Sequence, residues 1–194
     1  GEVERVMNMA DGCILLVDAV DGPMPQTRYV LQQAINYSLS PIVVINKIDR
    51  PESRISAVVN EVEELFLELA TDDSQLNYPV FFASAKAGYA IESVDDEPES
   101  ISPILDAIVK TIPSPTGSLD GGFQLLVTAL DYDDYAGQIA IGKIFRGSVS
   151  QKDSVLLINA DGVEINHKVE QLFVYQGMKK KKVETLLHLE NVKE

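Results

Sequence analysis

A short polar segment follows an apolar run at residues 42–45, and its composition points to a ligand. The run Ile42 to Ile45 is typical of a strand buried on both faces, and Asn46, Lys47, Ile48 and Asp49 come directly after it. Such a loop lies at the carboxyl end of its strand, where open parallel sheets bind ligands. A carboxylate accepts two adjacent N–H groups as a charge-assisted pair. Guanine presents such a pair at N1 and N2 and adenine does not, so we predict that Asp49 selects a guanine base.

Two other residues of this loop have predicted roles at the same base. Lys47 can lay its aliphatic stem over the base plane. The Asn46 amide can either donate to guanine N7 or tie neighbouring loops together. A buried carboxylate left unpaired by the wrong base discriminates by ~10⁴ or more, which would exclude ATP. Taken alone, however, four residues after a strand are equally consistent with an ordinary polar turn.

A second polar loop favours the base-binding interpretation. Ser84, Ala85 and Lys86 follow the next apolar run, Val80 to Ala83, and are therefore predicted at the same edge of the sheet. A backbone N–H of Ala85 or Lys86 can donate to guanine O6, the position where adenine carries an amine. We therefore predict that the two loops form the two sides of one base site.

Strands and helices alternate through residues 1–112. Cys13 to Val17 is a further apolar run, residues 26–37 have apolar positions at helical spacing, and a longer amphipathic helix follows the first polar loop. A last helix is predicted to end at Ile112. This alternation predicts an α/β fold in three layers with a parallel sheet.

The pattern changes near residue 113, which marks a predicted domain boundary. Residues 113–118 consist largely of Pro, Ser and Gly, so we place a linker at residues 113–122. Residues 123–194 have no helical periodicity and contain four β-rich runs, at 123–130, 138–145, 154–159 and 163–175. We predict a small antiparallel β-barrel there. Four clear strands leave open whether the barrel is complete.

The formal charge of −14 is unevenly distributed. Residues 1–115 carry 7 Lys and Arg against 19 Asp and Glu, or −12, and residues 116–194 carry 9 against 11, or −2. A domain at −12 repels phosphates, so any contact with nucleic acid must be local. The single cysteine, Cys13, fits a reducing cytoplasm, and the sequence has neither a long apolar run nor a secretion signal. We therefore expect a cytoplasmic protein without membrane contact.

Together, residues 22–28, residues 41–51 and the predicted barrel resemble the TypA/BipA family of translational GTPases, and the resemblance covers nearly the whole chain. It implies that residues 1–112 are the C-terminal part of a P-loop-type GTPase domain and that residues 123–194 are a translation-factor β-barrel. It also implies that GTP or GDP binds through Asn46, Lys47, Asp49, Ser84 and Ala85. The family acts at the bacterial ribosome under stress or cold, which implies rRNA and ribosomal proteins as partners.

Some features depart from the family pattern. Lys86 stands where the family commonly has an uncharged residue, although other GTPases also use lysine there, and the stretch Gly177 to Lys182 departs as well. GTP hydrolysis needs a P-loop, Mg²⁺ ligands and a positioned water, and this chain shows no sequence pattern for them. The resemblance implies that they precede Gly1. We therefore expect Mg²⁺ and turnover to belong to a longer parent protein and predict no catalytic or metal-binding residue in this chain.

Several alternatives stay open at this point. An elongation factor G-like GTPase would present the same loops, and a barrel module that binds only ribosome or RNA would need no nucleotide. The basic run Lys179 to Lys182 is either a contact to RNA phosphates or a solvated hairpin tip. The resemblance implies that the strand Cys13 to Asp18 lacks a neighbouring strand here, so we expect self-association through an apolar sheet edge.

Overall fold

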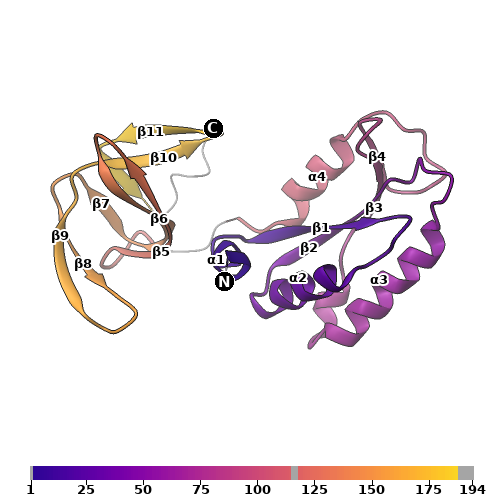
Figure 1. Cartoon of the computed structure of the whole chain (residues 1–194), viewed down its shortest axis with the longest axis horizontal. Helices are drawn as coiled ribbons and strands as arrows, with labels where there is room; N and C mark the ends of the chain where they lie inside the picture. The colour runs from indigo at the N-terminus through magenta and orange to yellow at the C-terminus, as the bar shows by residue number, and fades with distance from the viewer. Residues whose placement is uncertain (1, 115–117, 188–194) are drawn as a thin grey trace. The chain divides into compact units, whose positions relative to one another are not determined.

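The computed structural model describes residues 2–114 and 118–187 (Figure 1). The chain divides into two compact units, Gly1–Ser114 and Pro115–Glu194. Residues 115–117, in the middle of the predicted linker, lie outside the described residues, as do residues 188–194 at the end of the predicted barrel.

The first unit is built on a four-stranded sheet in the order β1-β2-β3-β4. The pairs β1–β2 and β2–β3 are parallel, and β4 is antiparallel to β3. The strands are β1 (Gly12–Asp18), β2 (Ser40–Asn46), β3 (Val80–Ser84) and β4 (Tyr89–Ile91). The helices are α1 (Glu2–Met7), α2 (Pro25–Asn36), α3 (Ile55–Leu69), the short 3-10 helix η1 (Asp73–Leu76) and α4 (Ser102–Thr111).

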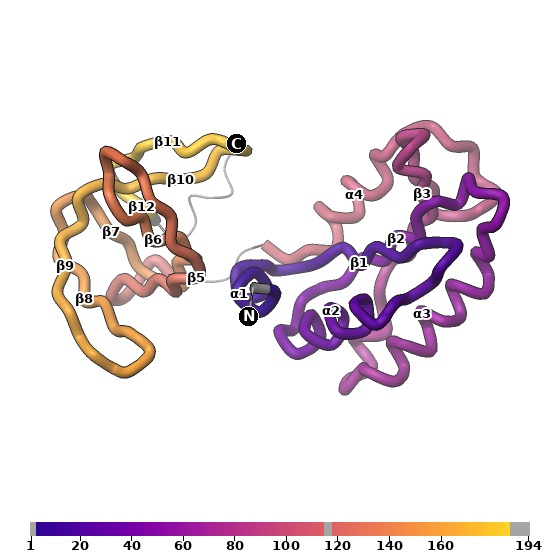
Figure 2. Tube along the Cα trace, viewed as in Figure 1, coloured from indigo at the N-terminus to yellow at the C-terminus, as the bar shows by residue number. Residues whose placement is uncertain are grey.

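Helices cover both faces of this sheet, which confirms the predicted α/β fold (Figures 1 and 2). Side chains alternate along a strand, so Val43 and Ile45 face α2 and α3 while Ile42 and Val44 face α4. The apolar positions of α3 recur every three or four residues, and Phe66, toward its C-terminal end, is fully buried. Two cores therefore hold the strand that carries the first polar loop.

Strand β1 lies at one edge of the described sheet, paired only with β2. Leu15 and Val17 are buried against α2 and α3. On the opposite face, Ile14 and Leu16 keep 47% and 60% of their surface exposed, because α4 packs on β2 and β4. This part of the sheet therefore exposes apolar side chains as well as unpaired backbone groups.

The second unit consists of antiparallel strands, as predicted, but among the described residues they pair two by two rather than as one continuous barrel sheet. The pairs are β5–β6, β7–β12, β8–β9 and β10–β11. The predicted run at residues 163–175 is broken into two strands. The bounds are β5 (Gln124–Asp133), β6 (Gly137–Arg146), β7 (Ser148–Ser150), β8 (Ser154–Ile158), β9 (Glu164–Lys168), β10 (Leu172–Gln176), β11 (Lys179–Val183) and β12 (Thr185–Leu187).

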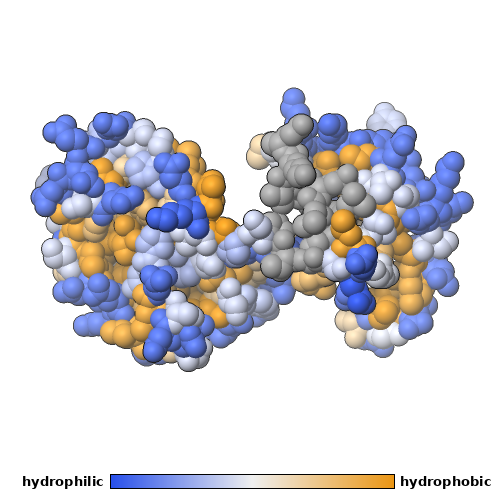
Figure 3. All heavy atoms as spheres, turned by 180° about the vertical axis from the view of Figure 1, so that it is seen from behind, coloured by the Kyte–Doolittle hydropathy of each residue, from blue (hydrophilic) through white to orange (hydrophobic). Residues whose placement is uncertain are grey.

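Apolar side chains reach the surface in both units (Figure 3). Within the described ranges, the helices are too short or too polar for any of them to cross a bilayer.

Candidate functional site

Three strand ends bring the predicted site residues to one edge of the sheet. In the parallel register Asp18 pairs with Asn46, and Asn46 pairs with Ala83. The loops that follow β1, β2 and β3 therefore leave the sheet side by side. This places Asn46, Lys47 and Asp49 next to Ser84, Ala85 and Lys86.

The Asn46 side chain joins the two predicted loops directly. Its Oδ1 accepts a hydrogen bond of 3.0 Å from the backbone N–H of Ala85. The backbone N–H of Ile48 donates to the carbonyl of Ala83 at 3.2 Å, which adds a second link. Of the two roles predicted for Asn46, the structure therefore shows the one that ties neighbouring loops together.

Asp49 is solvent-exposed and interacts with the fully buried Ser84. A hydrogen bond from the Ser84 side chain lowers the pKa of the Asp49 carboxyl, and the nearby charges of Lys86 and Arg50 lower it further. Ser84 also accepts a hydrogen bond of 3.2 Å from the backbone N–H of Ala87, so its hydroxyl is held in place. Asp49 is thus an ionised acceptor with a fixed neighbour.

The other members of the second loop differ in what they offer a ligand. The N–H of Ala85 is taken by Asn46. Within the described ranges, the backbone N–H of Lys86 has no protein acceptor. Of the two backbone donors predicted from the sequence, Lys86 is therefore the one still available.

Lys47 is held by a residue that the sequence analysis did not single out. Its backbone is left-handed, with φ of 67°, which a residue with a Cβ adopts only at a cost. Its Nζ forms an ion pair with Oδ2 of Asp18, at the end of β1, while Oδ1 of Asp18 accepts from the N–H of Val20 at 2.8 Å. The hydrogen bond from Lys47 is the main cause that lowers the pKa of Asp18. An acidic residue that ends an apolar strand was the signal available in the sequence.

Arg54, just before α3, connects the turn after β1 to the end of the loop after β2. Its Nε donates to the carbonyl of Val20 at 2.8 Å, and its Nη2 donates to the carbonyl of Asp21 at 2.9 Å. Its backbone N–H donates to Ala19, and its Nη1 pairs with Glu61 of α3. The turn, the loop and α3 are thus connected through one side chain.

The Asp18 contact predicts a pH-dependent stability. A carboxyl whose pKa is lower in the folded chain than in the unfolded one stabilises the fold above its unfolded pKa, about 3.9. This contribution is lost as the pH falls through the lowered folded pKa. We expect Asp18→Asn to cost about 1 kcal/mol at pH 7, the usual size for a hydrogen bond to a charged group that is partly open to solvent.

Urea denaturation between pH 7 and pH 3 measures this effect. The difference in unfolding free energy between the unsubstituted chain and Asp18→Asn should shrink below about pH 4. Asp106→Asn, on the exposed side of α4, serves as the control and should shift the urea midpoint little at any pH. A difference for Asp18→Asn that stays constant down to pH 3 would contradict the ion-pair argument.

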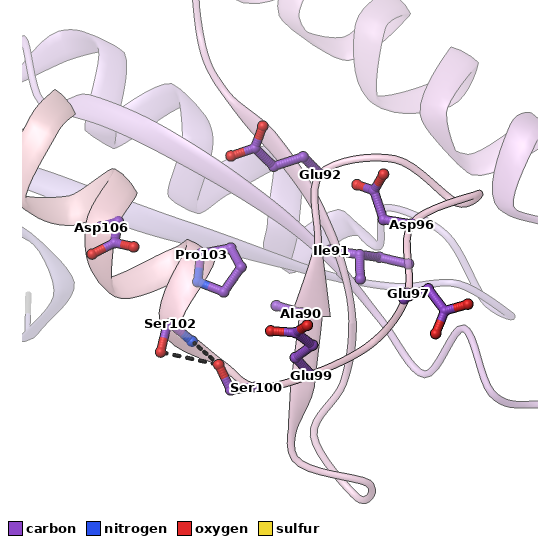
Figure 4. Close-up of a pocket in the computed structure, with 10 residues that line it drawn as sticks. All are labelled: Ala90, Ile91, Glu92, Asp96, Glu97, Glu99, Ser100, Ser102, Pro103 and Asp106. Atoms are coloured by element: carbon purple, nitrogen blue, oxygen red, sulfur yellow. Dashed lines mark hydrogen bonds between the residues drawn. The ribbon is translucent and has the colours of Figure 1, made fainter.

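Two cavities lie in the first unit. One of 310 Å³ lies between β4 and α4, where Glu92, Glu99 and Asp106 surround it (Figure 4). The other, of 430 Å³, lies at the start of α3. Neither is lined by Asn46 or Asp49. Among the described residues, no group of three or more His, Cys, Asp or Glu is arranged to hold a metal ion.

Comparisons with known proteins agree with this architecture. Residues 1–114 match the family described as the elongation factor Tu GTP binding domain. The large ribosomal subunit assembly factor BipA of Synechocystis sp. is 46% identical over 178 residues, which cover 92% of this chain and 30% of that protein. BipA of Escherichia coli strain K12 is 46% identical over 180 residues, covering 93% and 30% respectively.

BipA of Haemophilus influenzae is 44% identical over 180 residues, which cover 93% of this chain and 29% of that protein. The chain thus spans about 30% of the length of the BipA relatives that it matches. These relatives confirm the resemblance to the TypA/BipA family. The chain belongs to the family of elongation factor Tu GTP-binding domains, and its homologues are BipA proteins.

Proposed function

We propose that the first unit binds the guanine base of GTP or GDP at the edge formed by the loops after β2 and β3. The hydrogen bond between Asn46 Oδ1 and the Ala85 N–H carries this proposal, because it joins the two loops into one surface. Membership of a GTP-binding domain family supports the class of ligand.

Each residue of this surface has a distinct role in the proposal. Asp49 accepts the N1–H and the 2-amino group of guanine, and Ser84 holds the Asp49 carboxyl ionised and oriented. The Lys47 stem covers the base plane. The free N–H of Lys86 donates to guanine O6. Adenine satisfies neither Asp49 nor this donor.

Nucleotide titrations test the base site. We expect GDP and GTP to bind this chain weakly but more tightly than ATP, because the residues described above contact only the base. Isothermal titration calorimetry with the three nucleotides, each at equal Mg²⁺ concentration, measures the preference. Equal affinity for GTP and ATP would overturn the proposal.

We further propose that the whole protein hydrolyses GTP with Mg²⁺ and acts on ribosomes in the cytoplasm. The relatives named as large ribosomal subunit assembly factors support the ribosome as partner, through rRNA and ribosomal proteins. We assign no step of hydrolysis to the residues of this chain. Sedimentation of the whole protein with ribosomes, in GTP and in GDP, tests the association.

We also propose that the chain self-associates through the exposed edge of β1. Its free backbone groups can pair with a second strand, and Ile14 and Leu16 would become buried there. Multi-angle light scattering should show a fraction of dimer that increases with protein concentration. Leu16→Asp should abolish it, whereas Leu67→Asp, at an equally exposed apolar position on α3, should leave it unchanged. A strictly monomeric parent chain at high concentration would contradict this expectation.

A further inference from the structure

The hairpin of β10 and β11, residues 172–183, concentrates positive charge on the second unit. It carries four consecutive lysines, Lys179 to Lys182, and no acidic residue. All four lysines are exposed. Residues 116–194 have 9 basic residues in total, so nearly half of their positive charge lies on this one strand. We call residues 172–183 the lysine hairpin.

One of the four lysines holds the hairpin to a neighbouring pair of strands. Lys180 Nζ forms an ion pair with Oδ2 of Asp131 on β5. A hydrogen bond from Lys180 lowers the pKa of the Asp131 carboxyl. The contact therefore links the hairpin to β5 and offsets the charge of Lys180.

Within the part of the chain that the structure describes, the other three lysines have no such partner. Among the described residues, no ion pair involves Lys179, Lys181 or Lys182. Lys179 and Lys181 lie on one side of β11, about 7 Å apart along the strand, and Lys182 lies on the other side with Lys180. Because β10 is uncharged, nothing on the hairpin offsets the repulsion between these ammonium groups.

Cations on both sides of one strand, with no ion-pair partner among the described residues, fit a partner that carries a regular row of negative charges. The phosphates of a nucleic acid provide such a row, and binding releases the counterions condensed around them. Tyr175, the cross-strand neighbour of Lys180, is 54% exposed and offers a ring on which an unpaired base can stack. Phosphate contact combined with base stacking favours single-stranded or looped RNA over an acidic protein segment.

We propose that the lysine hairpin binds RNA along both of its sides, with Lys179 and Lys181 on phosphates on one side and, on the other, Lys182 on a phosphate and Tyr175 against a base. The choice of RNA rests on the ribosome association proposed above, and it does not depend on guanine-nucleotide binding. The contact is confined to the hairpin, because the chain as a whole carries −14 and repels phosphates elsewhere.

The salt dependence of binding to a 20-nucleotide single-stranded RNA tests this surface. Three phosphate contacts give a slope of log affinity against log salt of about −2, since each contributes about −0.7 on a single strand. Lys179→Gln, Lys181→Gln and Lys182→Gln together should bring the slope close to zero and weaken binding about tenfold at low salt. Asp131→Asn removes the ion-pair partner of Lys180, so Lys180 can contact a fourth phosphate. The slope should then become more negative by about 0.7.

Matched controls separate this surface from net charge and from the base site. Lys110→Gln, Lys152→Gln and Lys168→Gln remove the same charge elsewhere and should keep the slope near −2. The hairpin variant should keep the GDP-over-ATP preference, so failure of the base site and failure of the RNA surface are distinguishable. Sedimentation of the whole protein with ribosomes tests the ribosome association separately. The proposal would be overturned by an unchanged slope in the hairpin variant or by no RNA binding to the unsubstituted chain. Competition by polyglutamate as strong as that by RNA would also overturn it.

Discussion

Asp49→Asn is expected to change the base preference of this chain from guanine to xanthine. Asparagine keeps one acceptor but replaces the other with an N–H donor, so it no longer satisfies both donors of guanine. Xanthine keeps the N1–H and carries a carbonyl where guanine has its 2-amino group, which matches asparagine. We expect guanine affinity to fall by ~10²-fold, less than the ~10⁴ of an enclosed site because Asp49 is exposed.

This change is measured by displacing a fluorescent GDP analogue from the unsubstituted chain and a fluorescent analogue of xanthosine diphosphate (XDP) from the variant. GDP, XDP and ADP are the three competitors. Asp73→Asn, an equally exposed carboxylate in η1, removes the same charge and should leave the order of affinities unchanged. If Asp49→Asn still preferred GDP to XDP, Asp49 would not be the residue that recognises the base.

Phe66→Ala is expected to have the largest effect on stability. The Phe66 ring is fully buried in the core between α3 and the sheet, and it stacks on Tyr78 with ring centroids 3.8 Å apart. Removing it loses apolar burial and leaves a cavity, so the first unit should lose about 3–5 kcal/mol of unfolding free energy. Urea denaturation followed by far-UV circular dichroism gives this value for the transition of the first unit.

Leu67→Ala provides the comparison at the next position of the same helix. The Leu67 side chain is 67% exposed, so its removal should cost less than about 0.5 kcal/mol. The two positions lie on the same helix and differ mainly in burial. A loss below about 1 kcal/mol for Phe66→Ala would show that the core between α3 and the sheet contributes little to the stability of this unit.

The parallel sheet and its loops could be predicted because their signals are local. Ile42 to Ile45 form a short apolar run, and such a run buried between two helical layers is a strand irrespective of its partners. Once two such strands are parallel, the loops that follow them must meet at one edge. The proximity of Asn46 and Ala85 therefore followed from strand order rather than from any detail of the side chains.

Contacts between distant residues could not be predicted in the same way. The ion pair of Lys47 with Asp18 depends on the register of β1 against β2, which no residue of either strand specifies alone. Four lysines in a row do not alternate with apolar residues, so β11 had no strand pattern. Its structure comes instead from hydrogen bonds to β10 across the turn at Gly177, whose φ of 58° suits glycine.

Arg54 implies that the turn after β1 and the start of α3 open together. Its side chain and backbone satisfy the carbonyls of Ala19, Val20 and Asp21. Those carbonyls lose their donor if Arg54 moves, and an unpaired carbonyl there has only water as a substitute. In native-state hydrogen exchange the amides of Gly22 and Val58 should therefore exchange with one common opening free energy, as a single cooperative unit.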